Sequence, residues 1–158
     1  MRGWRLVNKR FAAEAFSGEG AKAVGGRWNS IGTAVVYASE NLSLAALELF
    51  IWLSEADKTE EFLVIPFDIP KDLVVAFPLS SLPRHWRAPD PVQETMEIGD
   101  AWVRSGDSAI FKVPSVVIPA EFNLILNPAH PEFKRLVIHP AESFTFDPRL
   151  WKNSTPSK

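Results

Sequence analysis

Glu48 stands out because it is the only charged residue between Asn41 and Ser54. The rest of that stretch is almost entirely Leu, Ala, Phe, Ile and Trp at helical spacing. Burying an isolated carboxylate is costly, so this side chain must either reach solvent at a cleft or find a partner. Glu48 is therefore a candidate functional acid that faces a cleft. The alternative is an ordinary carboxylate on a narrow exposed stripe of the helix.

Arg27 is the only charged residue between Ala23 and Ser39, and it directly follows Gly25 and Gly26. Paired glycines let the backbone come close to a ligand. A guanidinium at such a place suits a phosphate or a carboxylate, which it can hold with two parallel hydrogen bonds. The alternative is a surface arginine in a loop.

Tyr37 is the only tyrosine of the chain and lies near the end of an expected strand. At a strand end its hydroxyl can leave the core and point into a pocket. A single tyrosine on a strand is also compatible with a core side chain whose hydroxyl is satisfied internally, so Tyr37 by itself is a weak indication.

Two helices and a set of short strands are expected to position these side chains. The first helix runs from Leu42 to Glu55 with Asn41 available as its N-cap, and the second runs from Pro91 to Arg104. The expected strands are Trp4–Val7, Thr33–Ala38, Glu61–Ile69, Asp72–Phe77, Ala109–Val113, Ser115–Ile118, Phe122–Leu126 and Arg135–Ile138, with Ser143–Phe146 as a further edge. Helices packed against a mostly antiparallel, mixed sheet make an α+β domain.

The chain has 158 residues, 46% of them hydrophobic, which is enough for one compact domain with a real core. We expect this domain to span residues 1–150, and residues 151–158 to form a disordered polar tail. No apolar run reaches the roughly 18 residues that a membrane helix needs, and the first residues lack the apolar stretch of a secretory signal. These features predict a cytoplasmic protein with no membrane partner.

Charge and residue usage argue against several classes of function. Seventeen Lys and Arg against nineteen Asp and Glu give a net charge of −2, so direct nucleic-acid binding is not expected. The absence of cysteine excludes disulfides, thiolate catalysis and zinc sites built on cysteine. The three histidines are scattered, and no metal site is expected.

The segment from Gly18 to Ala23 matches the letters of the G-x-G-x-x-[GA] dinucleotide fingerprint. That fingerprint must leave a hydrophobic strand and open a helix. Here a mixed stretch from Arg10 to Phe16 precedes it and another β-like run follows it. A Rossmann domain is therefore not predicted. A serine hydrolase is not supported either, because no G-x-S-x-G elbow is present.

Several short strings, in this order, resemble the RES-domain family, the toxins of bacterial toxin–antitoxin pairs. They are Gly18-x-Gly20-Ala21, Gly25-Gly26-Arg27-Trp28-Asn29, Val36-Tyr37-Ala38, Ala46-Leu47-Glu48, Val113-Pro114-Ser115, Ile118-Pro119-x-Glu121-x-Asn123 and Ile125-Leu126-Asn127-Pro128-x-His130-Pro131. The resemblance extends from Trp4 to Leu150. At Trp4 itself the family more often has a tyrosine.

The resemblance implies a fold similar to that of ADP-ribosyltransferases, with a split, mixed β-core, flanking helices and a cleft that holds NAD. By position, Arg27, Tyr37 and Glu48 correspond to the central active-site residues of the family, and Ser115 corresponds to its serine. Substrate-binding candidates of second rank are Trp28 and Asn29. NAD is then the substrate, no separate cofactor is expected, and the expected protein partner is a helix-turn-helix antitoxin.

Members of the family deplete NAD by phosphorolysis or hydrolysis, and some transfer ADP-ribose to a protein. Breaking the bond between ribose and nicotinamide builds an oxocarbenium-like cation, which a nearby carboxylate stabilises. We expect Glu48 to face this cation. Arg27 would grip the pyrophosphate or incoming phosphate, Tyr37 would flank the ribose or nicotinamide, and Ser115 would donate a hydrogen bond to phosphate.

The expected function is therefore that of a type II toxin that degrades NAD and arrests growth, with phosphate or water as the acceptor. An ADP-ribosyltransferase that modifies a protein is one alternative. A noncatalytic ligand-binding or interaction module that keeps the fold is another.

Overall fold

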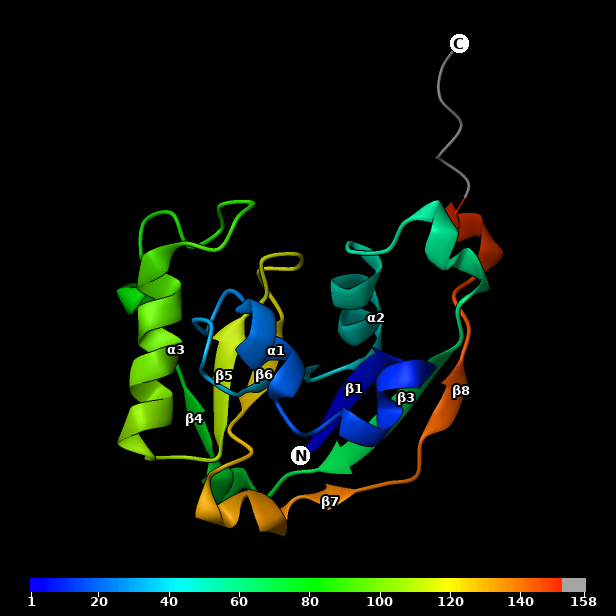
Figure 1. The fold of residues 1–158 in the computed structure, drawn as a ribbon. Coiled ribbons are helices and arrows are strands. Elements are labelled where there is room, and N and C mark those ends of the chain that lie inside the picture. Colours follow the sequence, from blue (N-terminus) through cyan, green and yellow to red (C-terminus); the bar gives the residue numbers. More distant parts are fainter. Residues whose placement is uncertain (152–158) are drawn as a thin grey trace.

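The computed structural model describes residues 1–151, which build an eight-stranded mixed sheet with helices packed against it (Figure 1). The strand order is β4-β5-β6-β2-β1-β3-β7, and β8 also pairs with β3. All neighbours are antiparallel except β4 and β5, which run parallel. The strands are β1 Arg2–Asn8, β2 Val36–Ser39, β3 Phe62–Asp68, β4 Val74–Ala76, β5 Ile110–Pro114, β6 Phe122–Leu126, β7 Val137–Ile138 and β8 Glu142–Phe144.

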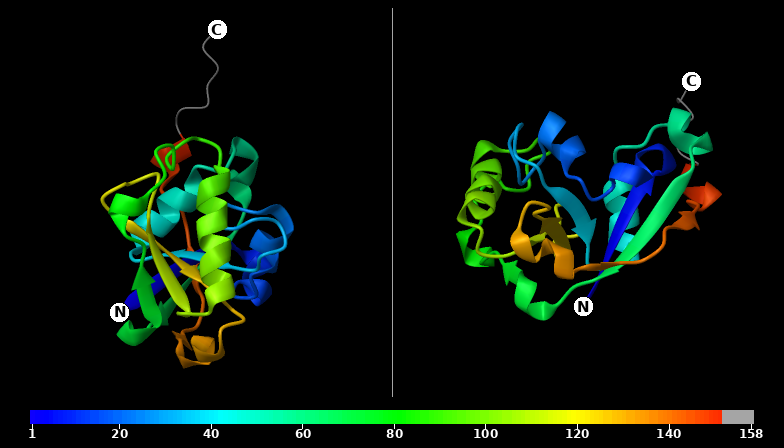
Figure 2. Two further views of the ribbon diagram at one scale, coloured as in Figure 1. Left: turned by 90° about the vertical axis from the view of Figure 1, so that its left-hand side faces the viewer. Right: turned by 60° about the horizontal axis from the view of Figure 1, so that its bottom comes forward.

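The sheet is split between β1 and β2, which share a single residue pair, Trp4 with Ser39. By contrast, β1 pairs with β3 from Arg2 to Asn8, and every residue of β2 pairs with β6. One half of the sheet is therefore β4, β5, β6 and β2, and the other is β1, β3, β7 and β8. The right-hand view of Figure 2 shows the two halves side by side. The α+β class with a split, mixed β-core is confirmed.

Three α-helices lie on the sheet, namely α1 Glu19–Val24, α2 Leu42–Phe50 and α3 Gln93–Ser105 (Figure 1). The predicted cap of α2 is confirmed, because the side-chain oxygen of Asn41 accepts a hydrogen bond from the N–H of Leu44 at 2.8 Å. The helix ends earlier than the predicted Glu55. After Phe50 the chain tightens, since the N–H groups of Trp52 and Leu53 bond to carbonyls three residues before them.

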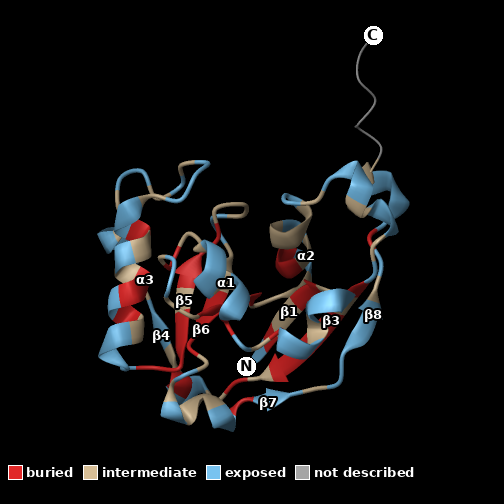
Figure 3. Cartoon of the chain, in the orientation of Figure 1, coloured by how far each residue is buried: buried red, intermediate tan, exposed pale blue. Residues whose placement is uncertain are grey.

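The core has two faces because side chains alternate along β5 and β6. One set packs toward α3 and the loop after α1, and comprises Phe111, Val113 and Ile125 with Trp28, Val35 and Trp102. The opposite set packs toward β3 and the connection that follows it, and comprises Ile110, Leu124 and Leu126 with Phe67, Ile69 and Leu136. Figure 3 shows that buried residues concentrate on the strands, while the helices turn exposed faces outward.

Some predicted elements differ in the structure. The predicted strand Ser115–Ile118 is wrong, since a turn forms there in which the Ser115 hydroxyl accepts a hydrogen bond from the N–H of Ile118. The helix α1 was not predicted because it is short and confined between Gly18 and Gly25, both of which have positive φ. β3 and β4 follow one another but do not pair, because β1, β7 and β8 occupy the edges of β3.

The predicted tail falls almost wholly on residues 152–158, which lie outside the described residues. Within residues 1–151, no helix is long and apolar enough to cross a bilayer. Nor does that part of the chain bring together three or more acidic or histidine side chains in an arrangement that could hold a metal ion.

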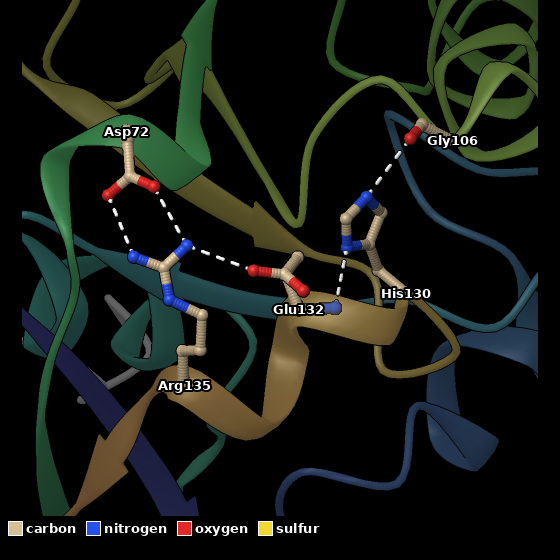
Figure 4. A network of polar contacts seen from close by, with 5 residues as sticks. All are labelled: Asp72, Gly106, His130, Glu132 and Arg135. Carbon is tan, nitrogen blue, oxygen red and sulfur yellow. Dashed lines mark hydrogen bonds and ion pairs between the residues drawn. The ribbon is translucent and has the colours of Figure 1, made fainter.

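A polar cluster fastens the segment after β6 to the rest of the fold (Figure 4). Arg135 bonds to both carboxylate oxygens of Asp72, at 2.8 and 3.2 Å, and to Glu132 at 2.9 Å. His130 accepts the N–H of Glu132 at Nδ1, so Nε2 carries the proton and donates to the carbonyl of Gly106 at 3.0 Å. The Asn-Pro-x-His-Pro string of the sequence thus holds the end of α3 in place.

Candidate functional site

A hollow of about 230 Å³ lies at the split of the sheet, and one face of α2 forms a wall of it. On that helix the lining residues Ala45, Glu48 and Leu49 are three and four positions apart, which places them on one face, and Trp52 lines the hollow from the turn that follows the helix. The other lining residues come from the strands and are Trp4, Arg5, Leu6, Tyr37, Ala38, Ser39 and Asn123. The solitary carboxylate of α2 therefore faces this hollow, as the sequence predicts.

The Glu48 carboxylate is held from one side only. Its Oε1 atom accepts a hydrogen bond from the Ser115 hydroxyl at 2.7 Å and another from the side-chain Nδ2 of Asn123. No residue between 1 and 151 donates a hydrogen bond to its Oε2 atom. The carboxylate is thus held through Oε1, while Oε2 accepts no hydrogen bond from the part of the chain that the structure describes.

Ser115 reaches Glu48 because the β5–β6 connection is tied to the start of α2. Lys112 forms an ion pair with Glu40 at 2.6 Å, and Asn41 donates to Glu121 at 3.1 Å. Ser115 itself is fully buried. Since its hydroxyl proton points to Glu48, its contact in this structure is with the carboxylate rather than with an open phosphate position.

Tyr37 is linked to the loop that follows α1. Its hydroxyl donates to Oδ1 of Asn29 at 2.7 Å and accepts the backbone N–H of Trp28 at 2.9 Å. Burial raises the pKa of the Tyr37 phenol above its ordinary value of 10.0, although the hydrogen bond from Trp28 opposes the shift. The hydroxyl is therefore neutral at physiological pH and can act as a donor.

The side chains of Trp28 and Asn29 are buried and hold the loop in place through ring contacts and hydrogen bonds to its backbone. The Trp28 ring packs against Phe77 and Phe111, and only 2% of the residue is exposed. Asn29 is fully buried, and its Nδ2 donates to three backbone carbonyls, those of Ala21, Ser30 and Thr33. The structure places both side chains inside the domain, where their contacts are with other protein groups, and the substrate-binding role expected for this pair stays a prediction.

Arg27 contacts a distant loop instead of an open phosphate position. Its Nη1 donates to the carbonyl of Trp86 at 2.7 Å, and its Nη2 donates to the carbonyls of Ala88 and Pro89 at 2.7 and 3.1 Å. A guanidinium binds an anion in a bidentate way through two neighbouring nitrogens, and each such pair includes Nη2. Because Nη2 already donates to two carbonyls of this loop, bidentate binding of an anion requires the loop to move. Burial lowers the pKa of Arg27, and the negative charge of Glu48 opposes that shift.

Arg5 is a cation that lines the hollow itself, whereas Arg27 does not line it. Its Nε donates to the carbonyl of Ala15 at 3.2 Å and its Nη1 to the carbonyl of Tyr37 at 2.7 Å, across the split of the sheet. Burial lowers the pKa of Arg5 to about 10, so it remains charged at neutral pH. Within residues 1–151 no carboxylate pairs with it, and its Nη2 donates to no protein group. A half-buried cation without a carboxylate partner, beside a hollow, is suited to an anionic ligand.

A second hollow, of about 260 Å³, lies elsewhere, between the ends of β1, β3 and β8. Its charged lining includes Lys9, which is already paired with Glu61, and both side chains are well exposed. Exposed ion pairs of this kind contribute little energy and give no group tuned for chemistry. The hollow beside Glu48 is therefore the candidate active site.

Comparison with known proteins agrees with the resemblance seen in the sequence. The RES domain family matches residues 2–147 of the chain. The chain belongs to the RES domain family. Among its relatives, it is 37% identical over 134 residues to Toxin Res of Photorhabdus laumondii, covering 85% of this chain and 86% of that protein.

For two further relatives of this RES domain, the similarity extends over nearly the whole length of both proteins. Toxin Res of Yersinia enterocolitica is 36% identical, covering 93% of this chain and 97% of that protein. The Prs ADP-ribosylating toxin of a Sphingobium species is 32% identical, covering 93% of this chain and 94% of that protein. The fold is also similar to a chain of the M. tuberculosis MbcT–MbcA toxin–antitoxin complex, with a TM-score of 0.72 at 16% identity, over 91% of this chain and 84% of that one.

In this RES domain the structure joins Glu48 to Ser115 and Tyr37 to Asn29, while Arg27 lies on the same loop as Trp28. Sequence reasoning did not assign roles to Arg5, Ser39 or Asn123. Arg5 could have been singled out locally, because it is a charged residue flanked by apolar residues in the strand β1. Asn123 stands in one of the strings that resemble the family, but no role was assigned to it there. Ser39 had no such signal, because a Ser near a strand end is common.

Proposed function

We propose that this RES domain is the toxin of a toxin–antitoxin pair and that it cleaves the bond between nicotinamide and ribose in NAD. The observation that carries the proposal is the Glu48 carboxylate, which faces a hollow with one oxygen held by Ser115 and Asn123 and the other without a hydrogen-bond partner among residues 1–151. The names of the relatives in Photorhabdus and Yersinia support the toxin part of the proposal.

In the proposed reaction the C1′–N bond of the nicotinamide riboside breaks, and its electron pair goes to the ring nitrogen. Nicotinamide then leaves as a neutral molecule, so no strong general acid is needed. The sugar carbon becomes cation-like, and the free oxygen of Glu48 stabilises that charge. An oxygen of phosphate or water then forms the new bond to C1′, and a proton is released to solvent if water is the acceptor.

Two arginines supply the complementary charge. Arg5 lines the hollow, its Nη2 donates to no group among the described residues, and it suits a phosphate oxygen of NAD or of the acceptor. Arg27 reaches an anion after the loop at Trp86 to Pro89 has moved, and until then it holds that loop against the domain. At the rim, Trp52 is 75% exposed and presents an aromatic face on which a planar ring can stack.

The test is incubation of the purified protein with NAD, with and without inorganic phosphate, followed by identification of the products. Phosphorolysis gives nicotinamide and ADP-ribose-1″-phosphate only when phosphate is present, whereas hydrolysis gives nicotinamide and ADP-ribose in both mixtures. Either result supports NAD cleavage. Intact NAD in both mixtures, from a protein with a cooperative melting transition, would overturn the proposed cleavage and leave transfer to a protein acceptor or a noncatalytic module.

A second candidate activity is transfer of ADP-ribose to a protein. The Sphingobium relative, at 32% identity, is named as an ADP-ribosylating toxin, and this favours the alternative. The chemistry at C1′ is the same, with a protein side chain as acceptor. Labelled NAD incubated with the enzyme and a cell extract separates the two, because label retained on a protein band indicates transfer and label in small products indicates cleavage.

The proposed partner is a helix-turn-helix antitoxin that covers the hollow. The fold likeness to a chain of a toxin–antitoxin complex supports a partner of this kind. NAD must enter from solvent, so a protein placed over α2 and the split of the sheet would block it. Expression of the chain alone is expected to lower cellular NAD and arrest growth, and co-expression of the antitoxin to restore both. Normal growth with unchanged NAD would contradict this.

A further inference from the structure

Ser39 of β2, Asn123 of β6 and Glu48 of α2 are linked by consecutive hydrogen bonds beside the split of the sheet. Asn123 of β6 is the register partner of Ser39 of β2, and Ser39 is the register partner of Trp4 of β1. The Ser39 hydroxyl donates to Oδ1 of Asn123 at 2.7 Å, and Nδ2 of Asn123 donates to Oε1 of Glu48. Ser39 is 2% exposed, so water does not compete for its hydroxyl.

The Glu48 carboxylate determines the direction of the hydrogen bonds that link it to Asn123 and Ser39. An ionised carboxylate can only accept hydrogen bonds, so Asn123 must present its NH₂ group to Glu48 and its oxygen to Ser39. Ser39 is then required as a donor. If that donor is lost, the amide oxygen is left without its buried partner, and the amide is less firmly held in the orientation that serves Glu48.

We propose that Asn123, held by Ser39, is a positioning residue that orients the Glu48 carboxylate so that Oε2 faces the reacting sugar. This inference rests on the proposed NAD cleavage and extends it to residues outside the Arg, Tyr, Glu and Ser set. Ser115 fixes Oε1 from the β5–β6 turn, and Asn123 fixes it from the sheet. The two donors together fix the rotation of the carboxylate. With one donor alone, the carboxylate could rotate about the single remaining hydrogen bond.

The first test compares Ser39→Ala and Asn123→Ala with Ser108→Ala. Ser108 is a matched control, since it is also buried and hydrogen bonded, to Trp102 and Ile110, but it lies outside the hollow. Misorientation of Glu48 is expected to lower kcat about 10- to 100-fold in Asn123→Ala, less in Ser39→Ala, with KM changed less than threefold. Ser108→Ala is expected to keep kcat. Equal kcat in all three variants would overturn the proposal.

A second variant, Asn123→Asp, is tested by the pH dependence of its activity, which would not change if Asn123 had only a structural role. Two carboxyl groups at this distance share a proton, and the protonated partner can still donate to Glu48 as the amide did. The activity of Asn123→Asp is therefore expected to recover as pH is lowered, giving a profile displaced to acid pH relative to the unmodified protein. An unchanged pH profile would count against the proposed orientation.

Crystal structures of the unmodified protein and of Asn123→Ala separate this inference from the proposed function. Glu48 is expected to keep one rotamer with its Ser115 contact in the first, and to rotate or occupy several rotamers in the second. An unchanged Glu48 in Asn123→Ala overturns the positioning role, whatever the enzyme does with NAD. Absence of NAD cleavage by the unmodified protein overturns the proposed function alone.

Discussion

Gly99 of α3 lies directly against the carbonyl group of Trp28, so that a Cβ atom on Gly99 would come within 1.7 Å of the Trp28 oxygen. The next residue, Asp100, accepts the backbone N–H of Ser30 at 3.0 Å. The helix thus supports the loop that carries Arg27 by backbone contact. This approach is possible only without a side chain at position 99.

Gly99→Ala is therefore expected to lower stability by about 3 kcal/mol or more, since the obstacle is backbone and cannot rotate away. NAD turnover should fall too, because the loop with Arg27 is displaced. The control is Gly20→Ala, where nothing lies within 4 Å of the added Cβ. In the helix α1 that change is expected to be neutral or to stabilise by up to ~1 kcal/mol. Thermal melting measures both, and a Gly99→Ala protein as stable as Gly20→Ala would contradict the packing argument.

Glu48→Gln is expected to leave the fold intact and remove catalysis. The glutamine carbonyl can still accept from Ser115 and Asn123, so stability should stay within about 1 kcal/mol. The charge opposite the sugar cation is lost, and turnover should fall by roughly 10²- to 10⁴-fold, or about 3–5 kcal/mol of barrier. NAD consumption and melting temperature on one preparation give the answer. Glu142→Gln, on the exposed strand β8, is the matched control, and near-normal turnover by Glu48→Gln would refute the site.

Tyr37 gives a clean optical test because it is the only tyrosine of the chain. With its pKa raised by burial, no phenolate absorbance should develop around pH 10 in the folded protein, whereas the protein in denaturant should titrate there. The folded state holds this proton more tightly than the unfolded state. Its contribution to stability is therefore complete below pH 10 and is lost as pH rises above it. A phenolate signal at pH 10 before unfolding would show that the hydroxyl is not buried as described.

Arg27→Gln is expected to release the loop from Trp86 to Pro89. Trypsin can cut within that loop after Arg87, and two residues before the loop after Arg84. Hydrogen bonds to a charged group are worth about 1.5–3 kcal/mol each, so even one lost bond should raise the rate of cleavage there about tenfold. Arg2→Gln, which removes an exposed ion pair with Asp68, should leave the rate unchanged. Equal rates in the two variants would mean that Arg27 does not hold the loop.

Local features of the sequence were sufficient for part of the site. A lone carboxylate on an apolar helix must face a cleft or a partner wherever that helix packs, and α2 satisfies both conditions through the hollow and through Ser115. The Asn41 cap was equally readable, because capping depends only on residues three apart. Most strands were found for the same reason, since their alternation is local, whereas the strand predicted at Ser115–Ile118 was wrong.

Contacts between distant residues were decided only by the tertiary structure. Ser115 and Asn123 lie 67 and 75 residues from Glu48, and they meet one oxygen of it because β2 and β6 pair in one register and the turn after β5 is tied to α2. A shift of one residue in that register would turn Asn123 to the opposite face of the sheet. The sequence alone determined the family and the lone acid on its helix. Which donors hold that acid, and that Arg27 binds a loop while Arg5 lines the hollow, was decided by strand pairing, which no local pattern specifies.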